Sequence, residues 1–356
     1  MKLKHKLLIF VLTFAIVFGV WFLYEKVTVT GFAIANHAAS SDIPAEGGAP
    51  IQVYFCPRDD CKGKLIALIE SSENIDCAFY DLTISEVKDA LKSKNYRLVV
   101  DKDNAKYVKE MNYKTNIGEQ GLMHDKFCVF DNANLSRQVG GVENHGVIFH
   151  NQTVFTGSFN PTSRQNSFDA NNVLIINSKY LAENYETEFE ELWSGRFAEG
   201  EPVKHKNIYY NSDMIENYFC PEDSCSEHLI TVLKSAQSEI KFLTFSFTHD
   251  EIGNILLEKA RNGIAVSGVF DKAQAGSEFS EFHKLNGTAD VRRDNLTGLL
   301  HHKVFIIDRK IVATGSFNPS KNADTKNDEN LLIIHSPAVA EKYLEEFGFI
   351  WNQTTS

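Results

Sequence analysis

Two copies of one polar motif occur in the chain, and their residue types suit acid–base chemistry on an anion. Each copy has the pattern His-x-Lys-x4-Asp, followed by Gly-Ser-x-Asn. The residues are His124, Lys126, Asp131, Ser158 and Asn160 in the first copy, and His301, Lys303, Asp308, Ser316 and Asn318 in the second. An imidazole acts as a nucleophile or as a general acid or base near neutral pH. Lysine, serine and asparagine donate hydrogen bonds to an oxyanion.

The two histidines together fit a reaction that needs an attacking group and a proton donor. Side chains alternate between the faces of a β-strand, so the His and Lys of each motif are predicted to share one face. If the two copies face each other, one imidazole attacks and the other protonates the leaving oxygen. The motifs contain no cluster of acidic ligands, so the sequence predicts neither a metal nor another cofactor.

The motifs belong to a longer internal repeat, which indicates how they are positioned. Tyr54–Pro57 recurs as Tyr218–Pro221, and from Ser158 onward the second copy follows the first at a constant offset of 158. The length of 356 residues suits about two domains at ~150 residues each. The repeat therefore predicts a duplicated domain, with copies at residues 51–200 and 207–356.

Within each copy, apolar runs typical of strands alternate with amphipathic stretches typical of helices, which predicts a layered α/β fold. The expected strands are residues 75–79, 97–100, 127–130, 154–156 and 173–176, and then 240–245, 264–270, 304–307, 311–313 and 331–334. The expected helices are residues 84–91, 180–193, 252–260 and 339–351. Between the motif Asp and the Gly-Ser the first copy has 26 − 7 = 19 residues more than the second, and residues 132–152 are predicted to form a loop or hairpin beside the first motif.

The doubled motif resembles the phospholipase D superfamily, and the resemblance extends over about residues 52–351. It implies two similar α/β/α sandwich lobes packed around a pseudo-twofold axis, with the motifs meeting at their interface. It also implies metal-independent hydrolysis of phosphodiesters through a phosphohistidine intermediate. His124 is then the nucleophile and His301 the general acid, with the reverse assignment open.

The same resemblance implies supporting roles for the other motif residues. Lys126 and Lys303 hold phosphate oxygens, while Asp131 and Asp308 orient the site. The further phosphate-binding residues are Ser158, Asn160, Ser316, Asn318 and Glu329. Glu329 occupies a position that is often acidic in the family, whereas the aligned residue of the first copy is Asn171. The two half-sites are therefore predicted to be electrostatically unequal.

The N-terminus predicts a membrane anchor. Leu7–Tyr24 is an uncharged run of 18 residues preceded by Lys2, Lys4 and Lys6. That length is just sufficient to cross a bilayer as a helix, and the lysines favour a cytoplasmic N-terminus. We expect a signal-anchor over residues 1–25, a flexible stalk over 26–50 and an extracytoplasmic catalytic part. The alternative is a cleaved signal and a secreted protein.

Net charge and the expected anchor bear on the substrate. The chain carries 36 basic and 47 acidic residues, a net charge of −11, which becomes −14 when the three N-terminal lysines are set aside. This acidity argues against a protein that coats nucleic acid. Because an anchor would also hold the catalytic part near a bilayer, we expect membrane phospholipids as substrate, with an endonuclease and a non-catalytic anionic-lipid-binding protein as alternatives. A duplicated chain need not dimerise to complete its site, so we expect a monomer. A basic rim is expected from Arg58, Lys102, Lys106, Lys272, Arg292 and Arg293.

Four of the six cysteines form two matching pairs, Cys56 with Cys61 and Cys220 with Cys225. Outside the cytoplasm such pairs close local disulfides, and the alternative is one zinc site shared by all four. Cys77 and Cys128 are expected to be small buried apolar residues. The histidines without a counterpart in the repeat are expected on the surface or in loops; they are His145, His150, His249, His283 and His302.

Overall fold

The computed structural model describes residues 43–118, 121–131 and 152–354. The expected signal-anchor, the stalk up to residue 42, residues 132–151 of the expected loop, His145 and His150 lie outside these ranges. Among the residues described, none of the helices has the length and apolar character that a membrane crossing requires.

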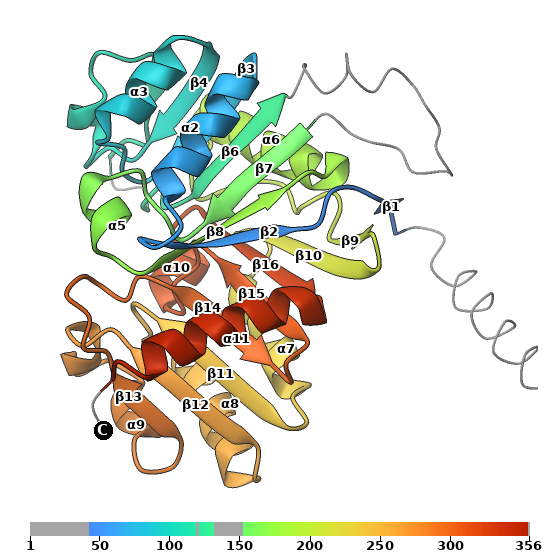
Figure 1. The fold of residues 1–356 in the computed structure, drawn as a ribbon, viewed down its shortest axis with the longest axis vertical. Helices are drawn as coiled ribbons and strands as arrows, with labels where there is room; N and C mark the ends of the chain where they lie inside the picture. Colours follow the sequence, from blue (N-terminus) through green and yellow to red (C-terminus); the bar gives the residue numbers. More distant parts are fainter. Residues whose placement is uncertain (1–42, 119–120, 132–151, 355–356) are drawn as a thin grey trace, which may run out of the picture. The chain divides into compact units, whose positions relative to one another are not determined.

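Two mixed β-sheets dominate the described part of the chain (Figure 1). In spatial order, the first sheet contains β2 (Gln52–Cys56), β8 (Asn171–Ile176), β7 (Gln152–Gly157), β6 (Lys126–Asp131), β3 (Asn74–Phe79), β4 (Asn95–Val100) and β5 (Tyr113–Lys114). The second contains β1 (Ala45–Glu46), β9 (Asn207–Tyr210), β10 (Asp213–Cys220), β16 (Glu329–His335), β15 (Ile311–Gly315), β14 (Lys303–Ile307), β11 (Glu239–Thr244), β12 (Ala265–Phe270) and β13 (Asp290–Arg293). From β10 onward the second order reproduces the first strand by strand, as expected of a duplication.

Helices cover both faces of each sheet. The longer ones are α2 (Cys61–Ser71), α3 (Ser85–Lys92), α6 (Lys179–Ser194), α7 (Cys225–Lys234), α8 (Asp250–Arg261) and α11 (Pro337–Trp351). The shorter ones are α5 (Ser163–Ser167), α9 (Phe282–Leu285) and α10 (Lys321–Thr325), besides the 3-10 turns Ala105–Tyr107 and Gln274–Gly276. The hydroxyls of Ser178 and Ser336 cap α6 and α11, which fixes where these two helices begin.

Three apolar clusters define the layers. One packs α2 and α3 on the outer face of the first sheet, and a second packs α7 and α8 on the outer face of the second sheet. The largest lies between the sheets and includes α6 and α11 from the two copies. Because this core is shared, Pro44–Ser356 forms one compact unit. The boundaries 51–200 and 207–356 stay a prediction.

The first strand crosses to the other copy. β1 pairs in parallel with β9 at the edge of the second sheet, in the register Ala45↔Tyr209 and Glu46↔Tyr210. The Tyr210 hydroxyl also donates a hydrogen bond of 2.5 Å to the Ala49 carbonyl. The beginning of the described chain is therefore attached to the second sheet.

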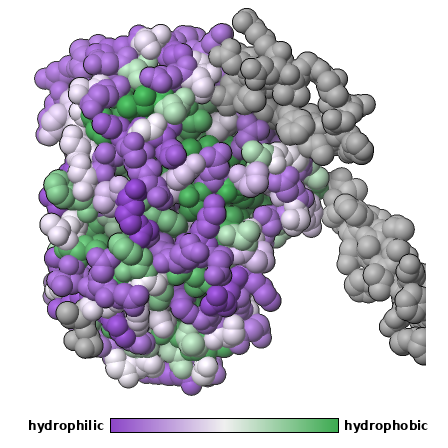
Figure 2. Space-filling model, in the orientation of Figure 1, coloured by the Kyte–Doolittle hydropathy of each residue, from purple (hydrophilic) through white to green (hydrophobic). Residues whose placement is uncertain are grey.

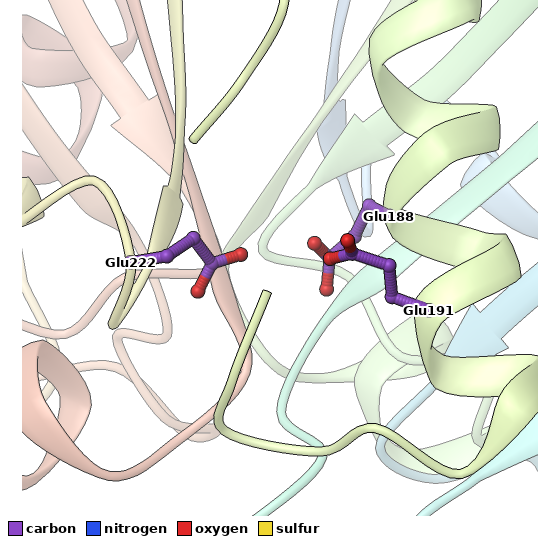
Figure 3. Close-up of side chains that lie close together, drawn as sticks. All are labelled: Glu188, Glu191 and Glu222. Carbon is purple, nitrogen blue, oxygen red and sulfur yellow. The ribbon is translucent and has the colours of Figure 1, made fainter. Parts of the chain in front are cut away.

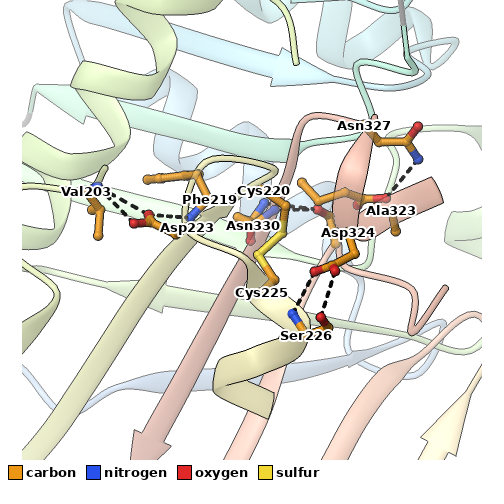
Figure 4. The surroundings of a disulfide bond; sticks show 12 residues. Val203, Phe219, Cys220, Asp223, Cys225, Ser226, Ala323, Asp324, Asn327 and Asn330 are labelled. Atoms are coloured by element: carbon orange, nitrogen blue, oxygen red, sulfur yellow. Dashed lines mark hydrogen bonds between the residues drawn. A yellow bond between two sulfur atoms is a disulfide. The ribbon is translucent and has the colours of Figure 1, made fainter. Parts of the chain in front are cut away.

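The two local cysteine pairs are disulfide-bonded, Cys56 to Cys61 and Cys220 to Cys225. This pairing confirms the disulfide prediction and leaves no thiolates for the zinc alternative. Figure 4 shows how the second disulfide is surrounded: Asp324 accepts hydrogen bonds from the backbone and hydroxyl of Ser226, just after Cys225. Each disulfide joins the end of a strand to the first residue of the following helix, so it fixes that turn.

Two predictions from the sequence need correction. Cys77 and Cys128 are buried as expected, but they are bonded to each other as directly paired residues of β3 and β6. Hydropathy alone does not distinguish a buried thiol from a buried disulfide. His302 was expected on the surface or in a loop, yet its side chain is fully buried between the two copies.

Candidate active site

The segments that carry the motif histidines pair with the opposite copy. His124, just before β6, donates its backbone N–H to the Asp328 carbonyl at 3.0 Å. His301, just before β14, donates its N–H to the Ala170 carbonyl at 2.8 Å. Asp328 and Ala170 each immediately precede a central strand of the other sheet. These reciprocal contacts bring the two motifs together, as the sequence predicted.

A repeated aspartate positions each of these segments. Asp101 Oδ2 accepts the backbone N–H of Met123 at 2.9 Å, and Asp271 Oδ2 accepts that of Leu300 at 3.2 Å. Met123 and Leu300 are the residues directly before the two histidines. The Asp-Lys repeat in the sequence therefore corresponds to a backbone contact that holds each histidine at the interface.

Each imidazole is oriented by a residue at the start of a strand in the opposite copy. His124 Nδ1 lies 2.7 Å from Glu329 Oε2, and His301 Nδ1 lies 2.8 Å from Asn171 Oδ1. His301 Nδ1 also lies 3.1 Å from the Ser158 carbonyl oxygen. Among the described residues, no hydrogen-bond partner contacts Nε2 of either ring. The inequality expected from the sequence is present: one imidazole has a carboxyl partner and the other an amide.

The two motif lysines are buried beside the histidines. Lys126 Nζ donates to the His124 carbonyl and Lys303 Nζ donates to the His301 carbonyl, the latter at 2.8 Å. Burial lowers the pKa of Lys126 to about 8. Burial and the neighbouring Lys126 hold the pKa of Lys303 well below its ordinary value. Negative charge from a bound phosphodiester would favour the protonated form of both amines.

Burial also acts on the histidines and on Glu329. The pKa of each imidazole lies well below its ordinary value because of burial and the adjacent lysines. Burial raises the pKa of Glu329 to about 8, although Lys126 and Lys303 partly oppose this. Burial therefore opposes charge on the two imidazoles, on both lysines and on Glu329 alike. A bound anion would therefore stabilise the protonated forms of the buried imidazoles and lysines.

The Gly-Ser-x-Asn segments form a tight turn beside each histidine. Gly157 and Gly315 have φ values of 140° and 152°, and an added Cβ would meet a backbone oxygen at 2.3 and 2.2 Å. Glycine is therefore required at both positions. The hydroxyls of Ser158 and Ser316 accept backbone N–H groups of the following central strands, at 3.0 and 2.9 Å. The serines thus fix the turns.

The two asparagines of these turns differ in their contacts. Asn160 Oδ1 accepts the Asp81 backbone N–H at 3.3 Å. The corresponding oxygen of Asn318 is buried without a hydrogen-bond partner in the described part of the chain. Among the described residues, the Asn318 amide oxygen thus differs from that of Asn160 in having no partner.

Asp131 and Asp308 are not brought to the histidines. Each lies five residues beyond the motif lysine, which is about 17 Å along an extended strand. Asp131 accepts a hydrogen bond from Asn74, and Asp308 accepts the backbone N–H groups of residues 237–239. Burial alone would raise the pKa of Asp308, but these bonds lower it. These partners place both carboxyl groups away from the imidazoles, so they do not touch the reacting atoms, and a role in orienting the site stays a prediction.

Two aromatic residues beside the site were missed by the sequence analysis. The rings of Tyr80 and His124 have centroids 5.0 Å apart, and those of Phe245 and His301 are 4.9 Å apart. Tyr80 and Phe245 align in the internal repeat. The shared aromatic position could therefore have indicated that both rings lie beside the site. Their rings shield the imidazoles and the adjacent lysines from solvent on one side.

The residues that follow the two histidines point to the opposite face and tie the copies together. Asp125 accepts from Asn330 Nδ2 at 2.6 Å, and His302 Nδ1 lies 3.3 Å from Asn172 Oδ1. His302 Nε2 lies 3.1 Å from Glu346 Oε1. This network explains the burial of His302: it is the interface counterpart of Asp125.

The residues expected to form a basic rim have partners within the fold. Arg58 pairs with Glu346, Lys272 donates to the Leu296 carbonyl, and Arg292 stacks on Trp351 at 3.7 Å. The other members contact neighbouring groups as well: Lys102 the Gly118 carbonyl, Lys106 the Tyr107 ring and Arg293 the Phe282 ring. These contacts give no support to a continuous basic track for a polymer.

Comparison with known proteins identifies the class of this site. A family model described as "Cardiolipin synthase, PLD-like domain" matches residues 65–193 and again residues 229–351. The chain belongs to this phospholipase D-like family, and both copies of the repeat are members of it. It is a phosphodiesterase of the phospholipase D superfamily.

Individual relatives agree with the family match. A phospholipase D of Rickettsia conorii is 32% identical over 147 residues, which are 41% of this chain and 74% of the relative. A mitochondrial cardiolipin hydrolase of Chlamydomonas reinhardtii is 32% identical over 122 residues, 34% of this chain and 54% of the relative. The phosphatidylserine synthase structure from Haemophilus influenzae has the same fold, with a TM-score of 0.63 and 13% identity over 88% of this chain and 89% of that chain.

Proposed function

We propose that the protein hydrolyses phospholipid phosphodiester bonds without a metal, through a phosphohistidine intermediate. The observation that carries the proposal is the convergence of two buried His–Lys pairs whose imidazoles have unlike partners. In the two half-sites, imidazole and ammonium groups supply a nucleophile, a proton donor and positive charge.

In the first step, Nε2 of His124 attacks phosphorus, and the bond from phosphorus to the leaving oxygen breaks. Nε2–H of His301 gives its proton to that oxygen, so an alcohol departs. In the second step, His301 takes a proton from water as the water oxygen attacks phosphorus. The P–N bond to His124 then breaks, which releases the phosphate monoester and restores the neutral imidazole.

The unlike partners favour His124 as the nucleophile. A carboxylate that accepts the Nδ1 proton stabilises the positive charge that develops on the ring as Nε2 bonds to phosphorus. Glu329 supplies that group to His124, because positive charge on Lys126 and Lys303 opposes the rise in the pKa of this carboxyl and so favours its ionised form. His301 has only the Asn171 amide oxygen and a carbonyl oxygen, so its imidazolium gives up a proton more readily. Lys126, Lys303, Asn160 and Asn318 are then the groups available to the phosphate oxygens.

Three observations support a lipid substrate. The matched relatives have names that refer to phospholipids or cardiolipin. A groove of about 350 Å³ is lined by Phe168, Leu296, Phe349 and Ile350, and it includes Ala170, which pairs with His301. Hydrophobic residues are exposed in patches between hydrophilic ones on the face shown in Figure 2. An acyl chain suits such a groove better than a nucleic acid does.

The proposal includes the place of action. We infer that residues 1–25 anchor the protein with its N-terminus in the cytoplasm, so that the enzyme works outside it at a membrane surface. Both half-sites come from one chain, which supports a monomer related internally by a pseudo-twofold axis. The three disulfides are consistent with an exported protein.

The test compares substrates in the presence of a chelator. We expect the full-length protein in detergent to release headgroup or phosphatidate from phosphatidylcholine or cardiolipin vesicles and to leave single-stranded DNA uncut. DNA cleavage without lipid turnover would establish the endonuclease alternative instead. Binding of cardiolipin vesicles but not of phosphatidylcholine vesicles, without any turnover, would indicate the anionic-lipid-binding alternative. Loss of lipid turnover on chelation, with recovery on adding a divalent metal, would contradict the metal-free mechanism.

A further inference from the structure

The apolar groove beside the active site opens at the surface through two exposed aromatic rings. Phe168, directly after α5, and Phe349, in the last turn of α11, line the groove and are 59% and 45% exposed. The groove also includes Ala170, whose carbonyl accepts the backbone N–H of His301. It therefore extends from the solvent to the segment that positions one of the two motif imidazoles. Large apolar side chains exposed around a binding site are typical of an interaction surface.

Basic side chains lie beside these rings. The Arg58 guanidinium lies 3.8 Å from the centroid of the Phe349 ring, and Lys272 donates a hydrogen bond to the carbonyl of Leu296 in the groove wall. Arg164 lies on α5, and its side chain is 65% exposed. We call the following residues together the groove surface: Phe168, Leu296 and Phe349, with Arg58, Arg164 and Lys272.

The carboxyl groups that pair with the two arginines lie below this surface. Arg58 pairs with Glu346, and Arg164 Nε lies 3.4 Å from Asp169 Oδ1. Both acidic residues are buried, whereas both arginines are exposed. The groove surface therefore presents its cations to the outside, while the matching carboxyl groups remain inside.

The equivalent surface of the other copy is acidic. In the internal repeat, Glu222 corresponds to Arg58 and Glu191 corresponds to Phe349. Glu188 and Glu191 extend from α6 toward Glu222 (Figure 3), and one carboxylate oxygen of each residue lies within 4.8 Å of the others. The same part of the fold is thus apolar and basic in one copy and acidic in the other, so the duplication alone does not account for the groove surface.

A bilayer that contains anionic phospholipid fits the groove surface. Aromatic side chains insert at the level of the lipid headgroups, and each nearby lysine or arginine adds attraction to anionic lipid. The chain as a whole has a net charge of −11, so an anionic bilayer would repel most of it and favour a locally basic surface. The other copy does not offer the same rings, since Lys326 and Glu191 occupy the positions of Phe168 and Phe349.

We propose that the groove surface docks on a bilayer of anionic phospholipid, so that a substrate lipid enters the groove directly from the membrane. The bilayer then lies against α5 and the C-terminal end of α11, while Glu188, Glu191 and Glu222 stay outside the contact. This inference rests on the lipid substrate proposed above, because the groove is the proposed site of an acyl chain. It adds which side of the protein faces the membrane.

A nitroxide label on one introduced cysteine reports which surface meets the lipid. All six native cysteines are in disulfides, so a single added thiol can be labelled. Ser167→Cys and Thr325→Cys are matched, because both residues are exposed and lie at the equivalent ends of α5 and α10. The full-length protein is reconstituted into vesicles of phosphatidylcholine and phosphatidylglycerol. We expect lipid-soluble oxygen to relax the label at residue 167 more, and a water-soluble nickel complex to relax it less, than the label at residue 325.

The outcomes separate the docking surface from the proposed reaction. Equal accessibility of the two labels to both reagents would overturn the docking surface. Spin–spin broadening at residue 167 would also overturn it, because a second copy of the chain would then cover this face. Lipid turnover without insertion of residue 167 would contradict only the docking surface, whereas insertion without turnover would support docking and contradict the proposed reaction.

A matched pair of substitutions tests the charge of the groove surface. Arg164→Gln should lower turnover of the mixed vesicles about fivefold, because it removes one cation near an anionic surface. Its rate on a water-soluble p-nitrophenyl phosphodiester should stay the same. Asn322→Gln, at the equivalent exposed position on α10, should leave both rates unchanged. An equal loss on both substrates with Arg164→Gln, or no loss on vesicles, would contradict the docking surface.

Discussion

The two copies hold their motif histidines through the same backbone contacts but give them different side-chain partners. In one half-site His124 contacts the buried carboxyl of Glu329, and in the other His301 contacts the amide of Asn171. The strand order and the position of each histidine before its strand are the same. Duplication therefore accounts for the geometry of the site, and divergence at one aligned position accounts for the difference in chemistry between its two imidazoles.

The outer cores of the two copies differ in a related way. Cys77 and Cys128 are directly paired on β3 and β6 and form a disulfide. The aligned pair on β11 and β14 is Phe242 and Phe305, whose ring centroids lie 5.7 Å apart. One cross-strand position is thus joined covalently in the first sheet and by aromatic packing in the second.

In each sheet, the strand next to this pair has a residue whose size suits it; the strand is β12 beside Phe242 and β4 beside Cys77. A Cβ on Gly268 would lie 2.0 Å from the Phe242 ring, so only glycine leaves room for that ring. The aligned position of the first sheet is Leu98, which fills the space beside the smaller Cys77. Each copy is therefore matched internally, and a single residue is not exchangeable between the two.

Removing either imidazole ring should have the largest effect and tests whether the two histidines have different roles. His124→Ala and His301→Ala should each lower phospholipid turnover by about 10⁴-fold, because one removes the nucleophile and the other the proton donor. A p-nitrophenyl phosphodiester separates them, since its leaving group departs without a proton. Rapid mixing should show a burst of nitrophenolate with His301→Ala and none with His124→Ala. The opposite pattern would reverse the assignment, and near-full turnover by either variant would contradict the paired mechanism.

Substitutions in the two cross-strand pairs measure how much each one stabilises its core. Phe305→Ala should lower the free energy of unfolding by about 3–5 kcal/mol, because it leaves a cavity among Phe242, Phe247 and the strands. Replacing both Cys77 and Cys128 with serine should cost less, about 2–4 kcal/mol. Urea denaturation of the oxidised proteins measures both values. A larger loss in the serine variant would show that the disulfide, not packing, dominates this position.

The charge difference between the half-sites is tested by Glu329→Gln. The glutamine retains a hydrogen bond to His124 but no negative charge, so kcat should fall about 10- to 100-fold, or about 1.4–2.7 kcal/mol. The burst amplitude and the steady-state rate distinguish slower attack from slower hydrolysis. An unchanged kcat would mean that Glu329 only orients the imidazole.

The substitution with the smallest expected effect is one that makes the two half-sites more alike. Asn171→Asp places a carboxylate beside His301 and should raise the pKa of that imidazole by about one unit, because opposite charge favours the protonated ring. His301 must be protonated in the first step, so the alkaline limb of the pH–rate profile should move upward by the same amount. A profile that moves downward or stays in place would show that His301 is not the proton donor.

Much of the site could be predicted because the repeat aligns residues that act together. The motif spacing predicted that His124 and His301 meet and that Glu329 and Asn171 differ. Strands in the middle of each sheet were predicted because their apolar runs are continuous, as in β6 and β14. The strands β2 and β10 were not predicted, although the repeated Tyr-Phe-Cys-Pro sequence lies at their ends.

Contacts between distant segments could not be predicted from the sequence. The burial of His302 depends on Glu346 and Asn172, which lie 44 and 130 residues away. The distance of Asp131 from the histidines follows from strand length rather than from the motif that contains it. Such contacts depend on how one copy packs on the other. A local sequence pattern does not contain that information.

The attachment of β1 to β9 affects how the chain could be divided. Cutting the chain within residues 195–206 would give two fragments, but the contacts between these fragments would remain. The N-terminal fragment would retain its strand on the second sheet and its share of the common core. The two fragments should therefore stay associated as a complementing pair, in which neither piece alone contains a complete active site.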